Sequence, residues 1–168
     1  SFQVISSYYS SNNLVSPGFC MVAYKLKNSL SSYGTVTRGL CTVKSELLTS
    51  VREVSGLKWA GRRVLSDVDF QLSGQEPVSM NFWGFTPKIF DYLNYEFKIF
   101  LENCGKDLKS EFLIPTVVND LIKSGKESID VLNTTAKWFG VTYKEDKSYV
   151  VNKIKTLTEN NIYPNSLF

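Results

Sequence analysis

Two polar side chains stand where apolar, strand-like stretches end. Glu53 lies in SVREV, and Asn81 lies in PVSMNFWGF, where Val78, Met80 and Phe82 occupy alternate positions. A carboxylate accepts paired hydrogen bonds, and an amide both accepts and donates them, so these side chains could recognise the hydroxyl groups of a ligand. The same residues have an ordinary interpretation, as a solvated glutamate and as a hydrogen-bonded asparagine within a sheet. Their spacing leaves both interpretations open.

Other residues that could contact a ligand lie in loops and near helix starts. Tyr33 and Gly34 precede a strand, and a glycine lets the backbone approach a ligand closely because it has no Cβ atom. Glu111 comes before a helix-opening stretch, where a negative charge also stabilises the helix N-terminus. Trp138 falls in an apolar run. A simple turn glycine, a helix-start glutamate and a core tryptophan are the structural alternatives at these positions.

The composition excludes several kinds of chemistry. The 168 residues contain no histidine, which removes Ser-His and Cys-His nucleophiles and most catalytic zinc sites. The three cysteines lack CxxC spacing, so we expect free thiols in a reducing compartment, the cytoplasm. The net charge of +3 is too balanced to indicate nucleic-acid binding. We see no apolar stretch of the roughly 18 residues that a membrane helix needs, and no secretory signal pattern.

The hydrophobic periodicity predicts alternating strands and helices in a single domain over residues 1–168. The expected helices cover 2–11, 87–103, 115–124 and 147–160. The expected strands cover 19–26, 37–43, 48–54, 62–68, 78–85, 128–134 and 137–143. This pattern is typical of the α/β class, with a mixed sheet flanked by helices.

The strand over 78–85 is expected to be central, because it feeds the helix over 87–103 directly. Alternation puts Met80 and Phe82 on one face, and we predict that this face packs against that helix. The apolar run over 19–26 is typical of a strand that is buried on both faces.

Several stretches together resemble the sugar-nucleotide pyrophosphorylases, a nucleotidyltransferase family. They are MVAYKLKNSLSSYGTVTRGLCTV, LTSVRE, PVSMNFWGFTPKIFDYL, KSEFLIPTVVNDLI and KWFGVTYKEDKSYVVNKI, in the order of the family. These enzymes transfer a nucleotidyl group from a nucleoside triphosphate to a sugar 1-phosphate. The resemblance covers the C-terminal, sugar-binding half of the domain and implies part of a GT-A-like fold.

The resemblance implies roles for individual residues. It assigns sugar contacts to Tyr33, Gly34, Glu53, Asn81 and Glu111, and a phosphate contact to Lys109. An offset of two residues in the match would put Ser79 in the place of Asn81. The implied ligand is a sugar 1-phosphate or a nucleotide-sugar.

The sequence departs from the family pattern at two places. Val54 stands where a basic residue usually grips the sugar phosphate, and Arg52 is expected to point to the opposite face. Gly140 stands where the second metal-binding aspartate would fall. Glu145 and Asp146 follow closely, but we expect them to cap the last helix.

The family's first half carries a Gly-rich phosphate loop and a metal-binding aspartate, and neither occurs in this sequence. We therefore expect the chain to be inactive by itself, and the Mg²⁺ of the full-length enzyme not to bind it. The alternatives are a non-catalytic module that binds sugar phosphates or nucleotide-sugars, and an interaction domain. Because the missing half would cover strands 19–26 and 78–85, we also predict self-association through an uncovered sheet edge.

Overall fold

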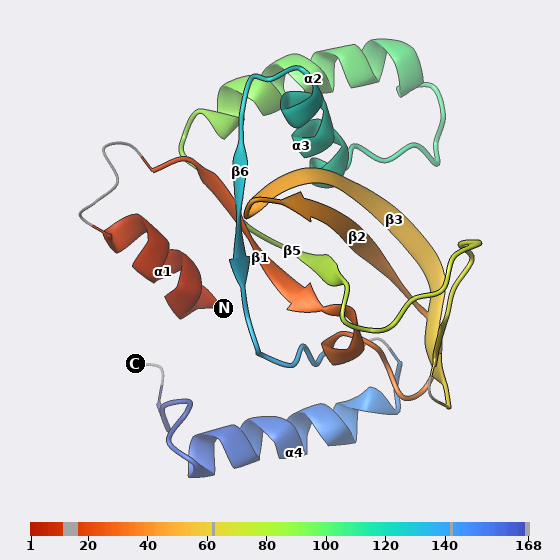
Figure 1. Ribbon diagram of the computed structural model, residues 1–168, viewed down its shortest axis with the longest axis vertical. Coiled ribbons are helices and arrows are strands. Elements are labelled where there is room, and N and C mark those ends of the chain that lie inside the picture. Colours follow the sequence, from red (N-terminus) through yellow and green to blue (C-terminus); the bar gives the residue numbers. More distant parts are fainter. Residues whose placement is uncertain (12–16, 62, 142, 167–168) are drawn as a thin grey trace.

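The computed structural model describes residues 1–11, 17–61, 63–141 and 143–166, which form a mixed sheet with flanking helices (Figure 1). The helices are α1 (Phe2–Ser10), η1 (Leu26–Asn28, a 3₁₀ turn), α2 (Ile89–Cys104), α3 (Ile114–Lys123) and α4 (Asp146–Glu159). The strands are β1 (Phe19–Lys25), β2 (Val36–Lys44), β3 (Leu47–Ala60), β4 (Arg63–Leu65), β5 (Pro77–Gly84) and β6 (Ile129–Asn133). The predicted α/β class is confirmed, and no described helix is both long and apolar enough to cross a membrane.

The sheet closes on itself. Its strand order is β2-β5-β1-β6-β3-β4, and β2 also pairs with β3, so five strands form a ring to which β4 is appended. β1 and β6 are parallel, and the other pairs are antiparallel. The expected uncovered edge at β1 and β5 is therefore wrong, because each of these strands has hydrogen-bonded neighbours on both sides. Self-association itself stays a prediction.

Strand β1 separates two hydrophobic cores, as its continuous apolar sequence predicts. Six of its seven residues are buried. Phe19, Met21 and Ala23 belong to one core, whereas Val22 and Tyr24 belong to the other. Successive side chains of a strand point to opposite faces, so both faces of β1 must be covered.

Helix α3 covers the first core and is tied directly to β3. Its buried residues Val117, Val118 and Leu121 recur at helical spacing and give the helix one apolar face. Asn119 accepts a hydrogen bond from the Val51 amide at 2.8 Å and donates one to the Val51 carbonyl at 2.6 Å. This double contact fixes α3 on β3 and brings the start of the helix close to the sheet.

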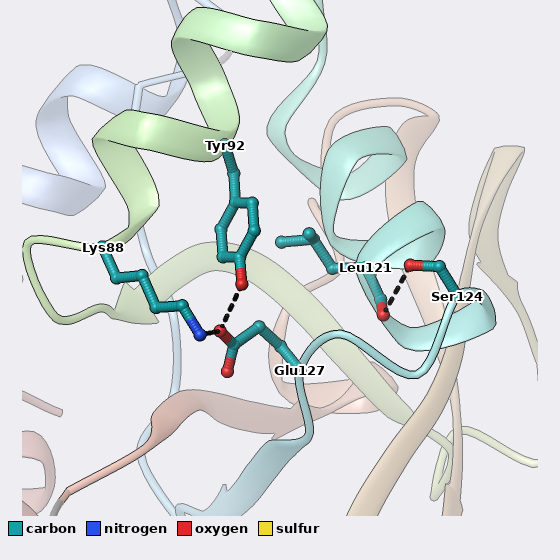
Figure 2. A network of polar contacts seen from close by, with 5 residues as sticks. All are labelled: Lys88, Tyr92, Leu121, Ser124 and Glu127. Atoms are coloured by element: carbon teal, nitrogen blue, oxygen red, sulfur yellow. Dashed lines mark hydrogen bonds and ion pairs between the residues drawn. The ribbon is translucent and has the colours of Figure 1, made fainter.

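A polar cluster joins the start of α2 to the segment that follows α3 (Figure 2). Lys88 Nζ lies 2.6 Å from Glu127 Oε1, and the Tyr92 hydroxyl donates to the same oxygen at 2.8 Å. Close by, the Ser124 hydroxyl donates to the Leu121 carbonyl at the end of α3. The cluster holds α2 and α3 at the same end of the molecule, opposite α4 (Figure 1).

We predicted that the face of β5 with Met80 and Phe82 packs against α2. This prediction is wrong, because the opposite face of β5 does so. Met80 and Phe82 are half-buried and belong to the second core, and Phe82 makes an edge contact with Phe2 of α1 at 4.8 Å. Trp83 and Phe85 pack in the core that α2 covers. The alternation does place Met80 and Phe82 on one face, but a strand pattern does not specify which face the following helix will cover.

The strand expected over 137–143 is absent from the described part of that segment, from which residue 142 is left out. Trp138 instead donates its backbone N–H to the Asn28 carbonyl at 2.9 Å, and its side chain packs on the second core. The backbone of Trp138 is thus hydrogen-bonded to η1 and not to a strand, in place of the series of strand-to-strand hydrogen bonds that a strand would form.

The remaining predicted elements are confirmed, with boundary differences of a few residues and a longer β3. All three cysteines are unpaired, as predicted. Burial raises the pKa of the Cys41 thiol to about 12, so this cysteine is a core residue and not a nucleophile.

Candidate functional site

Glu53 and Asn81, which come from different strands, line one pocket. The pocket has a volume of about 130 Å³ and is also lined by Thr37, Arg38, Gly39, Ser79, Met80 and Pro115. Strands β2, β3 and β5 contribute its floor, and Pro115 in the first turn of α3 contributes a wall. We call it the Gly39 pocket.

Gly39 lies at the centre of this pocket because three strands meet there. It is paired with Glu53 on β3 and with Ser79 on β5. A Cβ atom at position 39 would lie 2.8 Å from Val51 Cγ1 and 3.2 Å from the Ser79 Cβ atom. Glycine therefore permits the close approach of the strands and leaves the floor of the pocket open. Sequence reasoning missed Gly39, and an isolated glycine within a strand is the signal that could have indicated it.

Asn81 adopts an unusual backbone conformation for a residue in a strand. Its φ is +54°, in the left-handed region, and the β1–β5 register shifts next to it, between Ser79 and Trp83. The backbone N–H of Asn81 donates a hydrogen bond to Ser79 Oγ at 3.1 Å. Ser79 is buried, Asn81 is exposed, and both line the Gly39 pocket, so either could contact a ligand there. Strained backbone of this kind often occurs at functional sites.

The Glu53 carboxylate is exposed and accessible. Within the described residues it has no hydrogen bond or ion pair. The pocket thus offers a free carboxylate, an amide and hydroxyl groups. This chemistry suits a ligand with several hydroxyl groups, such as a polyol.

Arg38 is the basic residue that sequence reasoning missed. It is paired with Val54 across the β2–β3 ladder, so it stands directly opposite the position where a basic residue was expected. Its Nε atom donates to the Ser29 carbonyl at 3.0 Å, and its guanidinium lies 4.9 Å from the centre of the Trp138 ring. Burial lowers the pKa of the Arg38 guanidinium.

The side chain of Arg38 is directed away from the Gly39 pocket. Because Gly39 and Arg38 are adjacent in a strand, they face opposite sides of the sheet, and Arg38 borders the pocket through its backbone. A cross-strand pair like Arg38 and Val54 could be found from sequence only with the hairpin register, which a shift between Thr42 and Val43 alters.

Tyr33 lines a second pocket, of about 110 Å³, with Trp138, Gly140 and Asp146 among its other residues. Gly34 lies beside it and is covered by Tyr143, whose hydroxyl would be in direct contact with a Cβ atom at position 34. The Tyr143 hydroxyl donates to the Thr35 carbonyl at 2.7 Å. Tyr143 thereby holds the loop that contains Tyr33 and Gly34. Tyr33 lines a pocket separate from the one lined by Glu53 and Asn81, and Gly34 is in neither lining.

Glu111 and Lys109 lie in the connection between α2 and α3, and both are exposed. Neither is among the described residues that line the two pockets. The structure places the pocket wall at Pro115 and not at these two residues, so their predicted sugar and phosphate contacts stay predictions.

No group of three or more acidic or cysteine side chains that could hold a metal ion occurs among the described residues, and the expected absence of Mg²⁺ binding stays a prediction. Gly140 occupies the predicted position of a metal-binding aspartate, and Asp146 supplies the carboxylate of that pocket. Asp146 is buried in the first turn of α4 and accepts a hydrogen bond from the backbone N–H of Tyr143 at 2.7 Å, whereas Glu145, at the N-cap position, makes no side-chain capping hydrogen bond. A magnesium site needs carboxylates that are free to coordinate, together with substrate phosphate or water.

Neither a family model nor a curated protein matches this chain in the comparisons with known proteins.

Proposed function

We propose that residues 1–168 form the sugar-binding portion of a nucleotidyltransferase with a GT-A-like fold, and that the Gly39 pocket holds the sugar of a sugar 1-phosphate. The observation that carries the proposal is the convergence of Glu53 and Asn81 in one pocket. Glu53 belongs to β3 and Asn81 to β5, and both side chains are of types that recognise hydroxyl groups.

The chemistry of the pocket favours the sugar over its phosphate. Glu53 offers two acceptor oxygens to neighbouring hydroxyl groups, and Ser79 and Asn81 supply complementary groups. Among the described residues that line the pocket, no basic side chain is directed into it, because Arg38 is bound to Ser29 on the other side of the sheet. The phosphate therefore extends beyond the pocket, and Lys109 remains its proposed contact.

A titration of the ¹⁵N-labelled chain with several sugar 1-phosphates, followed by NMR, tests the proposal. We expect the amide signals of Gly39, Glu53 and Asn81 to shift. Glu53→Gln should weaken binding about tenfold, since it removes charge-assisted hydrogen bonds. Glu102→Gln is the matched control, because Glu102 is an exposed glutamate of α2 outside the pocket. If no sugar phosphate shifts the pocket signals at millimolar concentration, the proposal is wrong.

Catalysis by this chain alone is not part of the proposal. Electrostatic stabilisation of the transferring phosphoryl group supplies most of such catalysis, and the chain has neither the phosphate loop nor the metal aspartate of the family. We expect no pyrophosphate release from a sugar 1-phosphate and a nucleoside triphosphate with Mg²⁺. Release above the level of a Glu53→Ala variant would show that the catalytic groups lie within these residues.

A non-catalytic module for nucleotide-sugars is the alternative function. It is favoured if a nucleotide-sugar binds more tightly than the matching sugar 1-phosphate and the nucleotide itself contacts the chain. Saturation-transfer NMR, which reports which ligand protons lie against the protein, distinguishes the two cases.

A further inference from the structure

A large cavity lies between α1 and α4, away from the Gly39 pocket. Its volume is about 510 Å³, within the range typical of small-molecule sites. Its lining residues come from the start of α1, the segment that contains Trp138, α4 and the residues after α4. We call it the α1–α4 groove. It is lined by Ser1, Phe2, Gln3, Ala136, Lys137, Phe139, Lys153, Leu157, Ile162 and Tyr163.

The walls of the groove are apolar and only partly covered. Phe2 is 82% exposed and Ile162 is 64% exposed, and α1 has no buried residue. The apolar lining residues Ala136, Phe139 and Leu157 are half-buried. Large apolar side chains that gather around a cavity mark a surface that binds something, more often than single exposed ones do.

Two lysines give the groove its charge. Among the described residues that line the groove, Lys137 and Lys153 have charged side chains, and none has a carboxylate side chain. Lys153 is half-buried, and neither ammonium group has an ion pair within the described residues. By contrast, Lys155 on the same helix lies 3.9 Å from Glu159 and is exposed. The groove therefore combines an apolar, partly aromatic wall with positive charge that no acidic residue of the wall neutralises.

We propose that the α1–α4 groove binds an apolar organic anion, with its flat body against Phe139 and Leu157 and its acidic group beside Lys137 and Lys153. A lysine ammonium is a point charge without a fixed planar geometry, so a carboxylate, a sulfonate and a phosphate ester share the required chemistry. The site is separate from the proposed sugar pocket and does not depend on it.

A second copy of the chain is the main rival occupant. In a two-fold dimer the same surface meets itself, so Lys137 and Lys153 of both copies would be brought together without a counter-charge. This repulsion favours an anion over a second copy.

A matched pair of ligands tests the proposal on the full 168-residue chain. 2-Naphthoate and 2-naphthamide share a ring system and differ in charge. By the efficiency of ligands of this size, we expect naphthoate to bind with a Kd of about 1 mM, and naphthamide about fivefold more weakly. In ¹⁵N NMR titrations naphthoate should shift the amide signals of Phe139, Lys153 and Leu157. Equal affinity of the two ligands, or shifts elsewhere, would overturn the proposal.

Variants at two lysines of α4 separate charge in the groove from charge on the helix. Lys153→Gln should weaken naphthoate binding about two- to fivefold and leave naphthamide unchanged, because partly exposed ion pairs contribute little each. Lys155→Gln should change neither. If both variants behave alike, the groove lysines do not hold the anion. Light scattering over a dilution series accompanies the titration, and a dimer that naphthoate fails to dissociate would assign the groove to a second copy instead.

Discussion

Helices α3 and α4 both carry apolar residues at helical spacing, but only α3 buries them. α3 buries Val117, Val118 and Leu121, whereas in α4 the sole buried residue is Asp146, and Val151 and Ile154 are exposed. A stripe shows that a helix has a face to cover, but it does not show that the cover lies nearby. In α3 the cover is the first core. In α4 the apolar side lies partly in the α1–α4 groove, and the rest of it is exposed to solvent.

The comparison predicts that shortening an apolar side chain will reduce the free energy of unfolding strongly in α3 and only slightly in α4. Leu121→Ala removes a fully buried side chain and leaves a cavity, so it should reduce the free energy of unfolding by about 3 kcal/mol. Ile154→Ala should cost less than about 1 kcal/mol, because that side chain is 44% exposed. Urea unfolding followed by circular dichroism measures both. Equal losses would mean that α4 is as well covered as α3.

A second pair of variants compares the polar anchor of α3, Asn119, with Asn152, an exposed polar residue of α4. Asn119→Ala leaves the backbone N–H and carbonyl of buried Val51 without their partner, at a cost of about 1–3 kcal/mol. Asn152→Ala, at an exposed position of α4, should change stability by no more than about 0.5 kcal/mol. The same unfolding measurement applies. A negligible effect of Asn119→Ala would show that water or a shifted α3 satisfies Val51.

The smallest expected difference concerns the ion pairs. Lys88 lies 2.6 Å from Glu127, whereas Lys155 and Glu159 are 3.9 Å apart and both exposed. Hydrogen bonds to Glu127 and then to Tyr92 raise the pKa of Lys88 above its ordinary 10.5. A raised pKa stabilises the folded state fully below the unfolded value, and this contribution is lost as the pH rises through the folded value.

Lys88→Gln should therefore lower the melting temperature slightly, by an amount that is constant at neutral pH and shrinks only above pH 10.5. Lys155→Gln should leave the melting temperature unchanged, because exposed ion pairs contribute little. Scanning calorimetry of both variants at several pH values measures these melting temperatures. A difference for Lys88→Gln that vanishes already near pH 8 to 9 would assign the effect to another group.

Much of the fold was predictable because local patterns are strong in this sequence. The apolar run of β1, the hairpin of β2 and β3, and the helices α2 and α3 all follow from periodicity and from the positions of proline and glycine. The candidate site was predictable only in part. Glu53 and Asn81 were identified by their chemistry, but Gly39 was not, because its importance arises from two strands that approach it from either side.

The sequence by itself determined most element types and the two-sided burial of β1, whereas Glu53 and Asn81 lie inside β3 and β5 and not at strand ends as expected. Tertiary structure alone decided that the sheet closes through β2, that Met80 and Phe82 face α1, and that Trp138 pairs with η1. The physical reason is the range of the interactions. Backbone preference and side-chain alternation act between neighbours and leave a periodic trace in the sequence. Strand pairing and the choice of a covering helix join residues that are far apart in the chain, and these contacts leave no such trace.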